Sequence, residues 1–169
     1  MSSRVSKEEF AQLVRLHAAE VIDVTSHLLT ERSEAEDVAQ DAFVKAYRQL
    51  SSFRGESSLL TWVQRIAYRE ALNHLSRKRP DMVDIESLSV DDETADELAL
   101  DTEQRIQFLE EAIDELLPDE QLLLHLFYYK NVKLRDVAYI MDVEPNLLSA
   151  RLYRIRKKLY RMIKQKENE

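Results

Sequence analysis

The chain has 169 residues, with 24 Lys and Arg against 32 Asp and Glu, and it contains one glycine and no cysteine. A single glycine excludes the glycine-rich loops that cradle phosphates and disfavours a turn-rich all-β fold. The lack of cysteine excludes disulfides, thiolate zinc sites and a cysteine nucleophile, and no apolar run is long enough to span a membrane. We therefore expect a soluble, cytoplasmic protein built of helices.

The spacing of apolar residues predicts three helices in the first half of the chain. The first helix follows a capping box, Ser6-x-x-Glu9, and runs to about residue 28. The second follows another box, Ser33-x-x-Glu36, and carries a stripe of small residues that permits close packing. The third runs from about residue 59 to near Pro80. Together they predict a helical domain at residues 1–79.

Residues 80–102 carry many acidic residues and show no sustained apolar period, which predicts a flexible linker. The helical pattern returns at residues 103–169, where Pro118 suits the first turn of a helix and two further helices are expected at about residues 134–141 and 145–164. The predicted fold class is therefore all-α, with two small helical domains joined by a flexible acidic linker.

The last two predicted helices have the spacing of a helix-turn-helix. Leu148, Leu152, Ile155 and Leu159 form one apolar stripe of the final helix, and its opposite face carries short side chains followed by cations. A helix that docks in the major groove of DNA needs this arrangement. An ordinary amphipathic terminal helix is the alternative interpretation.

Charge is distributed unevenly along the chain. Sixteen of the 32 acidic residues but only one of the 24 basic residues lie between Asp81 and Glu120, while Arg151 to Lys166 contains eight Lys and Arg and no acidic residue. Clustered cations on both sides of an acidic segment favour a polyanionic partner, although a basic face can also be simply solvated.

With these helices assigned, the sequence resembles the extracytoplasmic-function sigma factors, the smallest class of bacterial sigma-70-like factors. The segments that carry the resemblance are Ala35 to Tyr47, Phe53 to Ser58, Thr61 to Ala67, Leu117-Pro118 and Ser149 to Leu159. The resemblance covers nearly the whole chain in the family's order of first domain, linker and second domain. It implies a sigma factor, not an enzyme, that directs core RNA polymerase to promoters and melts the −10 element.

The resemblance implies that the second helix binds the coiled-coil clamp helices of the largest polymerase subunit. The corresponding residues here are Glu36, Asp37, Gln40, Asp41 and Phe43. An acidic, amide-bearing surface beside an aromatic side chain suits a charged partner helix. Favourable interaction with the helix dipole is an alternative role for the first two.

The loop after the second helix, together with the third helix, would contact the promoter −10 element. Capture of an unstacked base requires aromatic or polar groups on a mobile loop beside cations. The candidate residues are Phe53, Arg54, Ser57, Ser58, Arg65, Tyr68, Arg69 and Asn73. Phe53 can alternatively pack against its own domain.

The second domain resembles the family's reader of the promoter −35 element. Its candidate residues are Asn146, Ser149, Ala150, Tyr153, Arg154, Lys157 and Lys158. The turn before this helix usually carries glycine in the family, and here Asp142 stands in its place.

We expect core RNA polymerase, promoter DNA and a cognate anti-sigma factor as partners, a monomer when free, no membrane insertion and no cofactor. The four histidines lack the spacing of a metal site. Two alternatives remain at this point. An autonomous helix-turn-helix transcriptional regulator would bind promoters by itself, and a helical scaffold would use its basic faces to bind an acidic protein.

Overall fold

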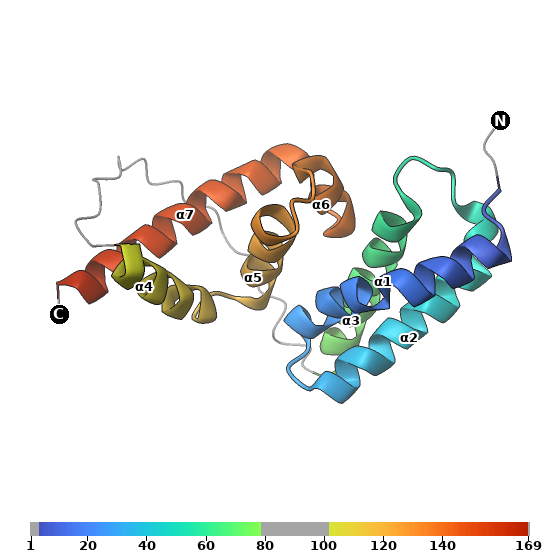
Figure 1. The fold of residues 1–169 in the computed structure, drawn as a ribbon, viewed down its shortest axis with the longest axis horizontal. Helices are drawn as coiled ribbons and strands as arrows, with labels where there is room; N and C mark the ends of the chain where they lie inside the picture. The colour runs from blue at the N-terminus through green and yellow to red at the C-terminus, as the bar shows by residue number, and fades with distance from the viewer. Residues whose placement is uncertain (1–3, 79–101, 169) are drawn as a thin grey trace.

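The structure is a computed structural model that describes residues 4–78 and 102–168. In the first half, α1 (Lys7–Leu28), α2 (Arg32–Arg48) and α3 (Leu59–Lys78) pack against one another, with a short 3-10 turn η1 (Leu50–Ser52) after α2. The second half contains α4 (Thr102–Asp114), α5 (Pro118–Leu124), the π-helical turn η3 (His125–Tyr129), α6 (Leu134–Ile140) and α7 (Pro145–Glu167). The described ranges contain helices and no strand, which confirms the all-α prediction (Figure 1). Apart from Thr102, where α4 begins, the predicted linker at residues 80–102 lies outside the described residues.

Small side chains allow α2 to lie close to both α1 and α3. Ala35, Ala39, Ala42 and Ala46 are buried along one stripe of α2, as the sequence predicts. Thr25 of α1 is also buried, and its hydroxyl donates a hydrogen bond of 2.8 Å to the carbonyl of Ala35. The alanine stripe therefore sets how closely the three helices pack.

One of the two predicted capping boxes is wrong. The hydroxyl of Ser6 accepts a hydrogen bond from the backbone N–H of Glu9, so the cap of α1 is present. By contrast, α2 begins at Arg32, and its N-cap, Glu31, makes no side-chain capping bond. Ser33 therefore lies inside the first turn, where its hydroxyl cannot cap the helix, and Glu36 instead accepts a hydrogen bond from Arg32 at 3.0 Å.

The helix-turn-helix is present as predicted. Val143 follows α6 and packs partly buried against the core, while Glu144 is the N-cap of α7 and Pro145 is at its start. The backbone N–H of Val143 bonds to the carbonyl of Ala138 at 3.0 Å, and that of Asp142 bonds to the carbonyl of Tyr139 at 3.3 Å. These two bonds form a Schellman motif, in which Asp142 has the positive φ of 55° that the motif requires.

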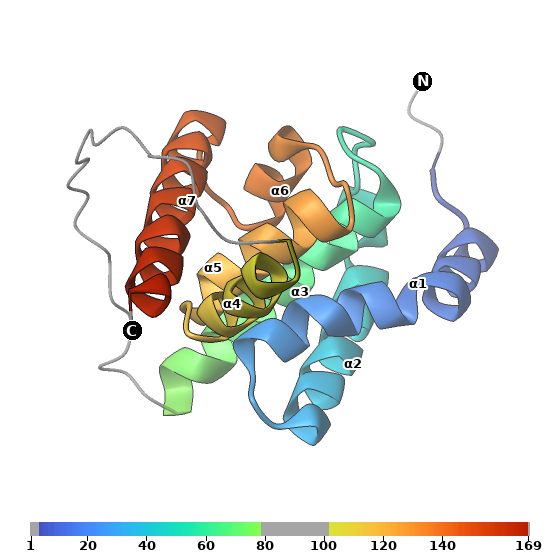
Figure 2. The ribbon, with the colours of Figure 1, turned by 60° about the vertical axis from the view of Figure 1, so that its left-hand side comes forward.

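The two halves of the molecule contact each other. α6 packs on α3, and α5 packs on α1, while α4 lies along α7 (Figures 1 and 2). Buried residues of both halves belong to one continuous apolar core. No helix among the described residues has the length and hydropathy needed to cross a membrane.

Enlarging a residue of the alanine stripe should destabilise the helical bundle. Ala42 is fully buried in a helix that packs on two others, so we expect Ala42→Leu to lower the free energy of unfolding by about 1–3 kcal/mol through overpacking. Urea unfolding followed by circular dichroism measures this change. Ala11→Leu, at an exposed position of α1, is the matched control and should change it by less than about 0.5 kcal/mol. Equal losses in the two variants would contradict the packing argument.

Candidate nucleic-acid interface

The predicted polymerase-binding residues lie mostly on one exposed face of α2. Asp37, Gln40 and Asp41 are exposed, and Glu36 is half-buried. Phe43 is also half-buried, and it packs against the apolar core rather than standing out as the aromatic group of this face.

Two further residues of α2 were missed by the sequence analysis. Val44 is 50% exposed and Tyr47 is 45% exposed, and the ring of Tyr47 lies 5.7 Å from that of Phe10. Both continue the face of Gln40 and Asp41 at helical spacing, which is the signal that could have identified them. This face of α2, comprising Asp37, Gln40, Asp41, Val44 and Tyr47, is called the α2 face below.

The loop before α3 presents one cation to solvent and anchors one aromatic ring. Gly55 adopts a φ of 76°, which turns the loop, and Arg54 beside it is exposed. The ring of Phe53 lies 5.2 Å from the half-buried ring of Trp62, so Phe53 is partly tucked against α3. Ser58 accepts a hydrogen bond of 3.1 Å from the N–H of Thr61, and its hydroxyl therefore caps α3. Ser57 is half-buried in the same loop.

Of the four candidate −10 residues of α3, three take part in the contact between the two halves and one does not. Asn73 is exposed, but Tyr68 is only 4% exposed, and its hydroxyl donates a hydrogen bond of 3.0 Å to Asp119 in α5. Burial, together with the nearby carboxylate, raises the pKa of Tyr68, so the phenol stays protonated as a donor. Burial also raises the pKa of Asp119, against the opposing effect of this hydrogen bond. The structure thus places Tyr68 inside the interface between the halves.

Arg65 and Arg69 reach from α3 to the turn between α6 and α7. Arg65 donates hydrogen bonds to the carbonyl of Tyr139 at 2.9 Å and to Oδ1 of Asp142 at 3.1 Å. Arg69 donates to the other carboxylate oxygen of Asp142 at 3.4 Å. The guanidinium of Arg65 also lies 4.4 Å from the centre of the Tyr139 ring. Both cations are therefore already paired with groups of the second half.

The start of α7 presents the exposed face that the helix-turn-helix pattern predicts. Asn146, Ser149 and Tyr153 are exposed, and Ala150 is half-buried beside them. The ammonium group of Lys157 lies 4.8 Å from the centre of the Tyr153 ring. Behind this face, the apolar stripe from Leu148 to Leu159 is buried, which leaves polar and aromatic groups facing outward.

Two of the predicted −35 cations have structural contacts. Lys158 forms an ion pair of 3.1 Å with Glu120 and so connects α7 to the start of α5. Arg154 is half-buried, and its Nε donates to the carbonyl of Ala150 in its own helix at 3.4 Å. Its Nη2 atom is buried and has no hydrogen-bond partner among residues 4–78 and 102–168. Neither side chain is as available to DNA as the sequence pattern suggests.

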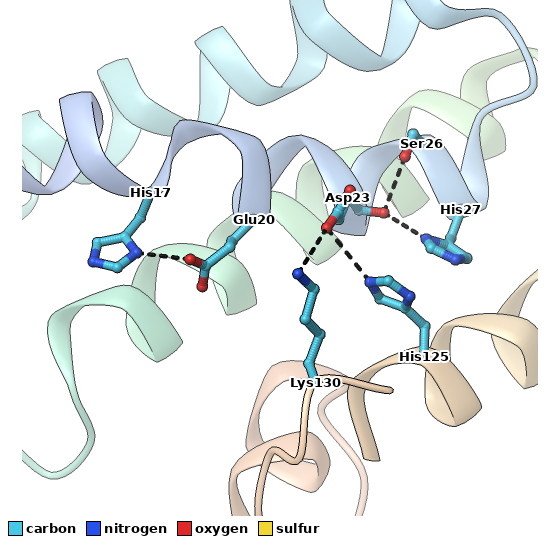
Figure 3. Close-up of polar contacts among 7 residues, drawn as sticks. All are labelled: His17, Glu20, Asp23, Ser26, His27, His125 and Lys130. Carbon is cyan, nitrogen blue, oxygen red and sulfur yellow. Dashed lines mark hydrogen bonds and ion pairs between the residues drawn. The ribbon is translucent and has the colours of Figure 1, made fainter. Parts of the chain in front are cut away.

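A second polar contact between the halves lies at α1 and η3 (Figure 3). The carboxylate of Asp23 lies 3.4 Å from Nε2 of His125 and 4.0 Å from the ammonium group of Lys130. The rings of His27 and His125 are 4.5 Å apart, and Tyr129 stacks on His125 at 5.3 Å. Burial lowers the pKa of His125, as does the nearby His27, whereas Asp23 opposes the shift.

Metal-binding geometry is not found in the part of the chain that the structure describes. Within residues 4–78 and 102–168, no group of three or more His, Asp or Glu side chains is placed to hold a metal ion.

The sequence matches known proteins along most of its length. Residues 13–80 match the family model described as Sigma-70 region 2. The chain is 31% identical over 164 residues to the RNA polymerase sigma-H factor of Pseudomonas aeruginosa, a match that covers 90% of this chain and 85% of that protein. It is 32% identical over 163 residues to the ECF RNA polymerase sigma-E factor of Haemophilus influenzae, with 89% and 85% covered.

The fold is similar to that of two solved structures. One is the sigma factor RpoE in complex with the anti-sigma factor NepR from Bartonella quintana, with a TM-score of 0.64, 24% identity, and 93% of this chain and 98% of that chain covered. The other is CnrH in complex with the cytosolic domain of CnrY, with a TM-score of 0.63, 18% identity, and 95% and 90% covered. At these identities the similarity shows a shared fold.

Acidification should destabilise the protein through His125. An unfolded chain keeps a histidine pKa near 6.5, above that of His125 in the folded protein, so the unfolded state takes up the proton first as the pH falls. The free energy of unfolding should therefore decrease below about pH 6.5. Urea unfolding at about pH 7.5 and about pH 5.5 measures this decrease, which should be smaller in His125→Gln. His17→Gln, at a histidine whose ring bonds to Glu20 of its own helix, is the control. If the free energy of unfolding depends on pH in His125→Gln as it does in the unmodified chain, the decrease is not due to His125.

Proposed function

The chain belongs to the extracytoplasmic-function sigma factors of the sigma-70 family, and we propose that it binds promoter DNA through exposed groups of the loop before α3 and of α7. As an RNA polymerase sigma factor, it directs core RNA polymerase to specific promoters and initiates transcription there. The proposal concerns which residues carry out each step. The observation that carries the proposed DNA contacts is the outward polar and aromatic face at the start of α7, opposite a buried apolar stripe.

We assign recognition of the −10 element to residues 1–79 and recognition of the −35 element to residues 103–169. Residues 80–102 form the connector between them. This division is supported by the packing of α1, α2 and α3 on one another and by the packing of α7 on α4, α5 and α6. It is also supported by the match of residues 13–80 to the Sigma-70 region 2 model.

With α6 packed on α3, we assign the −10 contacts to Phe53, Arg54 and Asn73. When α6 moves away from α3, Arg65 and Arg69 also become available to bind the −10 DNA. Arg54 is exposed on a loop turned by Gly55, beside an aromatic ring. An exposed loop with an aromatic ring and a cation can hold an unstacked base while the cation binds the DNA backbone. Ser58 caps α3, and we assign it a structural role.

The −35 contacts are assigned to Asn146, Ser149 and Tyr153, with Lys157 on a phosphate. An amide and a hydroxyl near the start of the helix can read base edges, and a cation further along can bind the DNA backbone. We do not assign a main −35 contact to Lys158 or Arg154. Lys158 is paired with Glu120, and Arg154 bonds to the carbonyl of Ala150 in its own helix.

The α2 face is assigned to the polymerase clamp. It combines acidic and amide groups with two exposed apolar side chains, Val44 and Tyr47, which supply the buried centre that a protein interface needs. We also propose control by an anti-sigma factor, since RpoE, which shares this fold, was solved in complex with one. We place the protein in the cytoplasm with core polymerase, and none of the proposed steps requires a catalytic group of this chain.

Transcription from purified components tests the function. The protein is mixed with core polymerase and a library of genomic promoter fragments, and the 5′ ends of the transcripts are mapped. We expect transcripts from defined start sites that core polymerase alone does not produce. Folded protein that adds no such transcripts overturns the proposal, and tight promoter binding without polymerase favours an autonomous helix-turn-helix regulator.

Removing the aromatic ring at the start of α7 should weaken promoter selection. We expect Tyr153→Ala to cost about 1–3 kcal/mol at the −35 base that it contacts, which is roughly 5- to 150-fold in promoter preference. Competition between promoter variants in the transcription assay measures this preference. Gln165→Ala, at an exposed position near the end of the same helix, is the control. An equal loss on every promoter variant would show that Tyr153 contacts the DNA backbone rather than a base.

A further inference from the structure

The turn of the helix-turn-helix holds a carboxylate against two cations of α3. Each oxygen of Asp142 accepts one hydrogen bond, from Arg65 at 3.1 Å and from Arg69 at 3.4 Å. The side chain of Arg65 is 22% exposed, whereas those of Asp142 and Arg69 are about half-exposed. Solvent can therefore compete for this contact, and so can another anion.

Arg65 is held on three sides at once. Besides the carboxylate, it donates to the carbonyl of Tyr139 at 2.9 Å, and its guanidinium lies 4.4 Å from the centre of the Tyr139 ring. A planar guanidinium that finds an anionic oxygen, a carbonyl and an aromatic face together makes a more specific contact than a lone surface ion pair. The contact therefore favours one orientation of α6 on α3.

The backbone at Asp142 adds a second constraint. Its φ of 55° lies in the left-handed region, where glycine or asparagine is the usual residue at the end of a helix. An aspartate there carries a carboxylate at the outer point of the turn, aimed at α3. The two oxygens and single negative charge present to the arginines what a DNA phosphate would present.

We propose that Asp142 is an intramolecular substitute for a DNA phosphate, which keeps Arg65 and Arg69 paired until promoter DNA replaces it. This inference rests on the proposed function, because it needs these arginines to bind the −10 DNA backbone. In this closed arrangement, with the turn against α3, Tyr68 of α3 is also buried, and its hydroxyl donates to Asp119 of α5. DNA and the turn cannot occupy the two arginines together, so each excludes the other.

Mutual exclusion has a measurable consequence for the free protein. The apparent affinity for DNA is the intrinsic affinity multiplied by the fraction of molecules in the open arrangement. Weakening the closed contact should therefore raise the affinity, and the gain should require the arginines. The bond between Tyr68 and Asp119 and the contact between Asp23 and His125 also stabilise the closed arrangement. Loss of Asp142 alone should therefore shift only part of the molecules to the open arrangement.

The first test measures binding of the full chain to single-stranded DNA. The probe is a fluorescein-labelled oligonucleotide of mixed sequence, followed by anisotropy. We expect Asp142→Asn, which suits the positive φ but removes the charge, to bind about three- to tenfold more tightly than the unmodified chain. Glu144→Gln removes one negative charge two residues away, from a side chain that makes no capping bond, and should change the affinity less than about twofold.

The second test measures opening without DNA. The chain has no cysteine, so Ser76→Cys in α3 and Lys133→Cys before α6, both at exposed positions, accept a pair of spin labels selectively. The distance distribution between the labels should gain a longer component in Asp142→Asn and remain unchanged in Glu144→Gln. Circular dichroism of each variant verifies that the helices remain folded.

The third test determines whether the gain in DNA affinity depends on the arginines. Adding Arg65→Gln to Asp142→Asn should return the affinity to that of the unmodified chain or below it. The inference is overturned if Asp142→Asn binds DNA no more tightly than Glu144→Gln, if the label distances do not change, or if the gain survives Arg65→Gln. The transcription assay with core polymerase reports separately on the proposed function. If the protein yields start-site-specific transcripts but Asp142→Asn shows no gain in DNA affinity, the inference about Asp142 is overturned and the proposed function is not.

Discussion

The contact of Arg65 with the end of α6 is the point at which the helix-turn-helix is held against α3. Its guanidinium satisfies the carbonyl of Tyr139, pairs with Asp142 and lies over an aromatic ring. Because α6 also begins the helix-turn-helix, the position of α7 and the exposure of α3 are set together. Under the proposed function, this contact opposes DNA binding by Arg65 and Arg69, while the face at the start of α7 stays exposed.

The cations of the second half fall into different physical settings although they lie close together in the sequence. Lys158 and Lys166 pair with Glu120 and Glu111, and these pairs connect α7 to α5 and α4. Arg154 is folded against its own helix. Part of the positive charge of α7 thus makes contacts within the fold, whereas the exposed side around Tyr153 carries the proposed −35 contacts.

Local signals explain why the helices and the helix-turn-helix could be predicted. The buried stripes of α2 and α7 follow the helical period, and Pro118 and Pro145 begin α5 and α7 because proline suits a first helical turn. The cap assigned to Ser33 failed because the helix begins one residue before it, and a residue inside the first turn cannot supply a capping geometry. Phe43, which also falls on the apolar stripe of the alanines, packs partly buried against the core, whereas Tyr47 is exposed.

The sequence by itself determined the helices, their buried faces, the family and the chemical types of the site residues, since caps, turns and apolar periodicity act over a few neighbouring residues. Only the tertiary structure decided which of those residues are accessible. Arg65 and Asp142 are 77 positions apart, and Tyr68 and Asp119 are 51 positions apart, so no local pattern contains their pairing. Those pairs exist because α5 and α6 dock on α1 and α3, and docking depends on the shape and charge of complete surfaces.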